Sequence, residues 1–392
     1  MNLFVALPDL RSAALARLAE LRVVMERDRI GAAVVLSAAN QTYLVGFRAL
    51  LYSRPIVLVV GPESTTLVVP GLEEAHAREV AAVDVVLVYH EHPAGGPWKD
   101  SVDCLDKTLA ELVSGQQVGI ELATCPAGLA AHLTEDGHRL ADLDHALTRM
   151  RAVKDETEIA VIREAGRVAG VGVAASLEAC HVGRSEIEVD GAGTSAVMAE
   201  VARLGGTTTV EQLIMTPSGR QRTSLPHALS TTRKLEPGDV LIHTRQVGLS
   251  GYRAELERTA FVGGADDEQA RVFEVIRSAQ QTAVRAVRAG VRCQDVDRAA
   301  REVIDDAGLG TFAIHRTGHG IGLSAHEPPY LRYDNAGRLE EGMVITIEPG
   351  VYIPGVGGFR HSDTVIVRAD GHEALTEHPA GLDRLTLEAS SG

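Results

Sequence analysis

The chain has 392 residues, of which 45% are hydrophobic, so it can bury more than one core and we expect a multidomain globular protein. Its 53 Asp and Glu residues outnumber its 38 Lys and Arg residues, which gives a formal net charge of −15 at pH 7. This acidity argues against nucleic acid and anionic membranes as partners, because both attract cationic surfaces. The four cysteines form no CxxC pair, and we find neither a leader pattern nor a long apolar run. We therefore expect a cytoplasmic protein with no disulfide framework and no membrane anchor.

The first part of the chain alternates helical and strand-like patterns, which indicates a small α/β domain over residues 1–149. The periodicity predicts a helix over residues 11–28. Apolar runs between Gly and Pro turn signals then predict strands at 32–36, 56–60, 65–69 and 83–89.

A second domain over residues 150–392 begins with a long amphipathic helix, predicted over residues 158–175. Further strands are predicted at 240–243, 258–262, 344–347 and 364–367. Histidines and carboxylates lie on or beside these strands. Because strand ends hold side chains more rigidly than loops do, this domain is the expected place for a catalytic site.

The densest group of candidate functional residues lies between residues 315 and 364. It reads HRTGHGIG from His315, HEPP from His326, GMVITIEPG from Gly342 and GGFRHSDT from Gly357. This order resembles the pita-bread hydrolases, the superfamily that contains methionine aminopeptidase, prolidase, Xaa-Pro aminopeptidase and creatinase. The resemblance extends to YLVGF at 43–47, the junction at 151–158 and the PH pair at 226–227. It implies an α/β (α+β) protein in which a creatinase-like N-terminal α/β domain precedes a C-terminal pita-bread (aminopeptidase-like) domain.

The resemblance also allows the metal ligands to be compared position by position. Peptidases of this superfamily bind two divalent metals through two Asp, one His and two Glu residues, and two of these ligands are present here, His319 and Glu348. The other three positions are altered: the chain has His243 followed by Thr244, the segment GYRAELERT at 251–259, and Ser362.

A dinuclear site needs bridging carboxylates to offset four positive charges, so these losses argue against two tightly bound metals. We therefore expect no metal cofactor. The alternative is a single divalent ion, manganese, zinc or cobalt, because three nitrogen or oxygen ligands suffice for a catalytic site. Its ligands would come from His243, Glu255, His319 and Glu348.

The segment GYRAELERT also resembles creatinase, the metal-free member of the superfamily. That resemblance implies catalytic roles for His227, Glu257 and Glu348. It implies a homodimer as well, because the aromatic-x-Arg element Tyr52–Arg54 would reach a partner's site. The substrate-binding residues implied by the motifs are Tyr52, Arg54, Tyr252, His319, His326, Arg332 and Arg360.

Without a metal, a histidine must act as acid and base, since its pKa lies near working pH, and His227 is the candidate. The paired carboxylates of Glu257 and Glu348 favour a planar cation, which they can bind bidentately. We therefore predict a metal-independent hydrolase of a C–N bond in a small zwitterionic amide, amidine or guanidino substrate. Two alternatives stay open: a metal-dependent Xaa-Pro dipeptidase or aminopeptidase with a nonstandard metal site, and a non-catalytic descendant that binds peptides.

Overall fold

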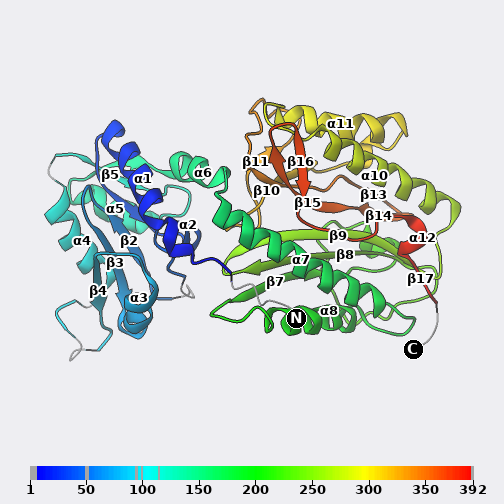
Figure 1. Ribbon diagram of the computed structural model, residues 1–392, viewed down its shortest axis with the longest axis horizontal. Coiled ribbons are helices and arrows are strands. Elements are labelled where there is room, and N and C mark those ends of the chain that lie inside the picture. Colours follow the sequence, from blue (N-terminus) through cyan, green and yellow to red (C-terminus); the bar gives the residue numbers. More distant parts are fainter. Residues whose placement is uncertain (1–6, 49–52, 93–95, 99, 114, 390–392) are drawn as a thin grey trace. The chain divides into compact units, whose positions relative to one another are not determined.

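The computed structural model describes residues 7–48, 53–92, 96–98, 100–113 and 115–389, and Figure 1 shows the chain coloured along its sequence. The chain divides into two compact units, one over Asp9–Arg151 and one that contains Ala152 onward. Each unit combines helices with a β-sheet, which confirms the expected α/β fold class. Among the residues that the structure describes, no helix has the length and apolar composition that crossing a bilayer requires.

The N-terminal unit is built around a six-stranded sheet. Its strands are β1 (Ile30–Val35), β2 (Val57–Val60), β3 (Thr65–Pro70), β4 (Val85–Tyr89), β5 (Gln117–Ile120) and β6 (Arg139–Asp142), in the order β4-β3-β2-β1-β5-β6. The strands β1, β2 and β3 are buried along their whole length, which explains their apolar runs. The helices are η1 (Leu10–Ala13), α1 (Ala14–Asp28), α2 (Ala38–Val45), η2 (Gly71–Glu73), α3 (Glu74–Val80), α4 (Ser101–Leu112), α5 (Ala127–Glu135) and α6 (Asp144–Ala152).

The second unit contains a nine-stranded sheet and a separate two-stranded one. The large sheet comprises β7 (Val210–Met215), β8 (Val240–Leu249), β9 (Tyr252–Val262), β10 (Gly318–Gly320), β11 (Glu327–Leu331), β12 (Val344–Ile347), β15 (Ser362–Arg368), β16 (Gly371–Ala374) and β17 (Thr386–Leu387). Seven of these strands follow the order β11-β10-β12-β15-β9-β8-β7, while β16 pairs with β15 and β17 with β9. The small sheet pairs β13 (Gly350–Ile353) with β14 (Gly357–Arg360).

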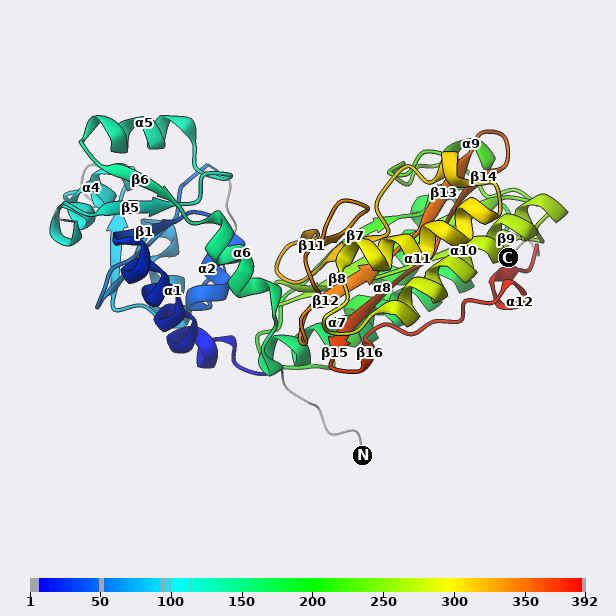
Figure 2. The same ribbon diagram turned by 90° about the horizontal axis from the view of Figure 1, so that it is seen from above.

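Helices cover the large sheet of this unit. They are α7 (Glu156–Glu178), α8 (Glu186–Val201), α9 (Arg220–Thr223), α10 (Asp267–Ala286), α11 (Cys293–Asp306), η3 (Gly310–Phe312) and α12 (Leu382–Leu385). Helix α7 packs on β8 and β9, and α8 packs on α7. Helices α10 and α11 pack against each other, as the view from above shows (Figure 2).

Helix α7 begins at residue 156, two residues before its predicted start, because Asp155 caps it. The Asp155 side chain accepts a hydrogen bond from the Glu158 amide at 2.9 Å, and the Glu158 side chain accepts one from the Asp155 amide at 3.0 Å. This reciprocal pair satisfies two amides that the first helical turn leaves without partners.

The prediction for β8 and β9 was too short at one end of each strand. Residues 240–243 and 258–262 were expected, whereas the strands span 240–249 and 252–262. The missed residues include Thr244, Gln246, Glu255 and Glu257. Because these residues are polar, a search for apolar runs does not recognise them as part of a strand. All four are buried, because they pair with one another and with neighbouring strands.

Close packing of α7 and α8 depends on two glycines that face each other. A Cβ added at Gly193 of α8 would lie 2.5 Å from the carbonyl oxygen of Gly172 in α7 and 2.3 Å from the guanidinium of Arg245 in β8. A Cβ at Gly191, in the same helix, would meet no atom within 4 Å. The contact between the helices therefore requires glycine at position 193 but not at position 191.

We expect Gly193→Ala to lower the free energy of unfolding by about 1–3 kcal/mol, because the helices must move apart to admit the methyl group. Urea unfolding followed by circular dichroism measures this change. Gly191→Ala is the matched control and should be neutral or stabilising by up to about 1 kcal/mol, since alanine favours a helix. Equal losses in the two variants would contradict the packing argument.

Candidate active site

The antiparallel register of β8 and β9 places four polar side chains on one face of the sheet. Thr244 lies opposite Glu257, and Gln246 lies opposite Glu255. The Thr244 hydroxyl donates to Oε1 of Glu257 at 2.7 Å, and the Gln246 amide donates to Oε2 of Glu255 at 2.7 Å. Because side chains on a strand alternate between faces, two carboxylates two residues apart point the same way.

The neighbouring strands bring further polar groups to this face. Ser362 begins β15, and its hydroxyl donates to Oε1 of Glu255 at 2.9 Å. Glu348 follows β12, and its carboxylate lies 3.3 Å from Nε2 of His319 in β10. One oxygen from each of Glu255, Glu257 and Glu348 lies within 4.8 Å of the others. The β8–β9 hairpin and three later segments of the chain therefore meet in one carboxylate-rich cluster.

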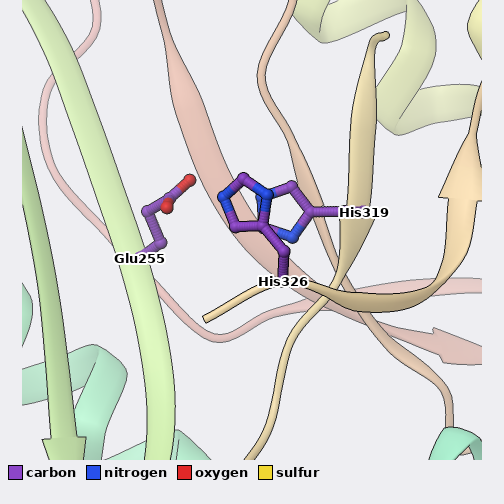
Figure 3. A group of neighbouring side chains, drawn as sticks. All are labelled: Glu255, His319 and His326. Atoms are coloured by element: carbon purple, nitrogen blue, oxygen red, sulfur yellow. The ribbon is translucent and has the colours of Figure 1, made fainter. Parts of the chain in front are cut away.

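Two histidines stack beside this cluster. The rings of His319 and His326 lie 3.7 Å apart at an interplanar angle of 20°, and Figure 3 shows the Glu255 carboxylate directed toward them. Nδ1 of His319 lies 2.9 Å from the carbonyl oxygen of Gly320, a contact that requires this nitrogen to carry a proton. In the neutral ring Nε2 is then left with its lone pair. This atom is buried and makes no well-aligned hydrogen bond.

Burial and mutual charge shift the pKa values of this cluster in opposite directions. Burial, together with the charges of Glu257 and Glu348, raises the pKa of Glu255 to about 7. Burial opposes protonation of His319, but its 3.3 Å contact with the Glu348 carboxylate and the other nearby carboxylate charges raise the pKa of His319 to about 9. The same contact outweighs burial at Glu348 and lowers its pKa to about 2. Three acidic side chains in a buried space therefore create a strong demand for positive charge.

Arg360, at the end of β14, supplies part of that charge. Its Nε donates to Oε2 of Glu257 at 2.5 Å and its Nη2 donates to Oε1 at 2.7 Å, which makes a bidentate ion pair. Burial disfavours the charged guanidinium, but Glu257 and the other anionic groups hold the pKa of Arg360 well above its usual value. Its side chain is only 4% exposed. Arg360 therefore neutralises Glu257, and its expected role as a substrate contact stays a prediction.

The cluster lies in the wall of a cavity of about 770 Å³. An apolar side of the cavity is formed by Leu213, Met215 and Ile314. The cavity is also lined by basic side chains, those of His227, His315, His326, Arg301, Arg316 and Arg332. The cavity thus combines an acidic floor, basic side chains and an apolar wall, which suits a small amphipathic ligand.

Most predicted site residues meet in this cavity. It is lined by His227, Glu257, Glu348, His326, Arg332, Arg360 and Glu255, and His319 stacks on the lining residue His326. Partial burial and the charge of His319 lower the pKa of His326 to about 4, so the His326 ring is neutral near pH 7. The buried ion pair between Lys154 and Glu327, at 2.8 Å, holds the strand that follows His326.

His243 does not join the cluster, contrary to the expected ligand set. It precedes Thr244 on β8, so its side chain points to the opposite face of the sheet, where Nδ1 lies 2.7 Å from the Thr216 hydroxyl. Burial and the charge of Arg245 lower its pKa well below the usual value. His243 is therefore a neutral core residue.

Three further predicted residues lie elsewhere. Tyr252 is buried and is not among the residues that line the cavity. Arg54 lies in the N-terminal unit, where its guanidinium is 2.8 Å from the exposed carboxylate of Glu91, and Tyr52 lies outside the described residues. The homodimer in which Arg54 reaches a partner's cavity stays a prediction.

Arg316 is a cavity residue that the sequence analysis did not select. Its Nη2 lies 2.9 Å from Nδ1 of His326, and its guanidinium stacks 4.5 Å from the ring centre of Tyr330. Its Nε is buried without a hydrogen-bond partner. The sequence carried a signal for it, because Arg316 lies inside the HRTGHGIG motif.

The donor atoms of the cluster fit one divalent cation. Nε2 of His319, which has no well-aligned hydrogen-bond partner, faces the carboxylates of Glu255 and Glu348, and a cation bound there would replace its proton. One imidazole nitrogen and two carboxylate oxygens form a ligand set that zinc, manganese and cobalt accept. The contact between Nδ1 of His319 and the Gly320 carbonyl orients the ring for such a role.

Comparison with known proteins agrees with this arrangement. Residues 160–369 match metallopeptidase family M24, and residues 17–153 match the creatinase/prolidase N-terminal domain. The Xaa-Pro dipeptidase of Pyrococcus horikoshii is 30% identical over 90% of this chain and 94% of its own length. That of Pyrococcus furiosus is 30% identical over 92% of this chain and 97% of its own length. The crystal structure of dipeptidase PepE from Mycobacterium ulcerans superposes with a TM-score of 0.84 at 29% identity, covering 98% of this chain and 100% of that chain.

These matches correct the expectation that the protein needs no metal. The family that covers residues 160–369 is one of metallopeptidases. The expectation rested on the missing carboxylates. However, β9 carries Glu255, and its carboxylate lies within 4.8 Å of a ring nitrogen of His319 and of a carboxylate oxygen of Glu348. In the folded chain Glu255 lies in two groups that could hold a metal ion, one with His319 and His326 and one with Glu257 and Glu348.

Glu255 makes the stability of the metal-free protein depend on pH. Because its pKa rises from an ordinary value of 4.5 to about 7 on folding, its stabilising contribution is complete below about pH 4.5 and is lost as pH rises through about 7. In chelator-treated protein we expect wild type to lose stability relative to Glu255→Gln over this interval, by on the order of 3 kcal/mol. Urea unfolding at several pH values measures the difference. Parallel pH profiles for the two proteins would contradict the raised pKa.

Proposed function

This chain belongs to metallopeptidase family M24, and on that basis we propose that it is a metal-dependent peptidase that hydrolyses dipeptides at Xaa-Pro bonds. As a member of the family it is a hydrolase of C–N bonds. Support for the substrate class comes from two relatives of about its own length, each of which is named Xaa-Pro dipeptidase.

The observation that carries the proposal is the orientation of His319. Its buried Nε2 faces Glu255 and Glu348, and after loss of its proton it would hold the divalent cation together with these two carboxylates. The chemistry that such a cation supplies when bound is Lewis-acid polarisation of the scissile carbonyl. An acidic cluster that already contains its own imidazole ligand is suited to this task.

The metal-independent amidine hydrolase is not supported, for a structural as well as a family reason. That hypothesis required Glu257 and Glu348 to bind a planar cation of the substrate. The bidentate partner of Glu257 is instead the protein's own guanidinium, that of Arg360. A substrate cation would have to displace a buried ion pair, and breaking such a pair costs about 3–5 kcal/mol.

Other cavity residues fit the remaining parts of a dipeptide. Arg316 forms no ion pair with any described carboxylate, and together with Arg332 it is placed to receive the substrate carboxylate. The wall containing Leu213, Met215 and Ile314 would receive the proline ring. The exposed ring of His227 lies on the same cavity and would accept and return a proton during cleavage.

We expect chelator treatment to lower the hydrolysis of Ala-Pro by roughly 100-fold or more, and manganese, zinc or cobalt to restore it. His319→Ala should lose both metal and activity, because it removes the single nitrogen ligand. His243→Gln is the control, since His243 lies on the opposite face of β8 and should leave metal content and activity intact. Metal content is measured by mass spectrometry and turnover by the release of proline.

The same assay separates the competing substrate classes. Creatine and cyclic amidines should not be hydrolysed with or without metal. Turnover of either compound in chelator, together with no cleavage of any dipeptide, would overturn the proposed function.

A further inference from the structure

The three carboxylates of the cluster have different partners. Glu255 receives hydrogen bonds from neutral groups, the Ser362 hydroxyl and the Gln246 amide. Glu348 faces the imidazole of His319. Glu257 alone of the three has both oxygens bound to a guanidinium, that of Arg360. Two carboxylates therefore remain available to a metal ion, while the third already has a counterion.

The Arg360 guanidinium is fully engaged. Besides Glu257, its Nη2 donates to the Thr244 hydroxyl at 3.1 Å, and its Nη1 donates to the Tyr352 hydroxyl at 2.8 Å and the Pro226 carbonyl at 3.1 Å. These contacts use all five N–H donors of an arginine. A cation so completely hydrogen-bonded in a buried site is a permanent part of the site, and an incoming ion will not displace it.

Two positions beside the carboxylates carry neutral hydroxyls, although a second metal ion would need further negative charge there. Thr244 lies beside Glu257, and Ser362 lies beside Glu255, each as a hydrogen-bond donor to the carboxylate. Neither hydroxyl adds a charge. The three carboxylates and one guanidinium therefore carry a net charge of −2 when ionised.

One divalent cation neutralises that charge, whereas a second would leave two positive charges buried without compensation. We propose that the Arg360 guanidinium takes the electrostatic place of a second metal ion, so that the site binds one divalent cation through Glu255, His319 and Glu348. Glu257 is then the counterion of Arg360 and no metal ligand. This inference rests on the proposed function for its first ion and departs from the two-metal arrangement that the family resemblance implies.

The test is the number of manganese ions bound per chain. Metal-free protein is saturated with Mn²⁺, and bound metal is counted by equilibrium dialysis with mass spectrometry. Electron paramagnetic resonance provides a second readout, since two neighbouring Mn²⁺ ions are exchange-coupled and a single ion is not. We expect one equivalent per chain and an uncoupled spectrum.

Three variants test whether Arg360 sets this number. Arg360→Met removes the internal cation and should raise the capacity above one equivalent. Arg360→Lys keeps the charge and should retain one. The double variant Glu257→Gln, Arg360→Met removes both members of the ion pair, so neither charge is left buried alone, and it should fold and retain one equivalent with a Kd within about tenfold of wild type.

The outcomes separate this inference from the proposed function. Two equivalents, or a coupled spectrum, in the wild-type protein would overturn the inference and leave metal dependence standing. A capacity of one in Arg360→Met would also overturn it, because another feature would then limit the site. A double variant that folds but no longer binds Mn²⁺ would make Glu257 a ligand and reject the assignment. No bound metal in active wild-type protein would overturn the proposed function and the inference together.

Discussion

The register between β8 and β9 is the constraint on which the candidate site depends. It sets Thr244 against Glu257 and Gln246 against Glu255, so that four polar side chains share one face of a buried ladder. A shift of the register by one residue would turn these side chains to the opposite face, where His243 now lies among core residues. Thr244 and Gln246 donate hydrogen bonds to the carboxylates of Glu257 and Glu255. These bonds reduce the cost of burying two carboxylates within one strand pair.

Charge compensation is the second organising feature. The cluster brings Glu255, Glu257 and Glu348 within a few ångströms; Glu257 has a permanent counterion in Arg360, whereas Glu348 faces the titratable imidazole of His319. The remaining demand for positive charge is visible in the raised pKa values of Glu255 and His319. A divalent cation meets this demand by replacing the protons of these side chains, because metal ligands bind in their deprotonated form.

The same ion pair argues against the cationic substrate that the sequence led us to expect. Two free carboxylates in a cleft would select a cationic substrate, but Glu257 is bound by a guanidinium that belongs to the chain. With Glu255 and Glu348 assigned to the metal ion, the remaining lining of the cavity includes the apolar side chain of Ile314 and basic groups such as Arg316. An uncharged peptide bond flanked by an apolar ring and a carboxylate matches these surroundings better than an amidine does.

The sequence by itself determined the family and the α/β fold, and it predicted most of the residues that line the cavity, because motifs such as HRTGHGIG and IEPG hold their residues at fixed spacing. It could not decide which side chains act together. The direction of His243 depends on strand alternation, and the pairing of Arg360 with Glu257 joins residues 103 positions apart. Only the tertiary structure shows that Glu257, one of the two glutamates predicted to be catalytic, already has a buried counterion, because a counterion is defined by distance and burial and not by position in the chain.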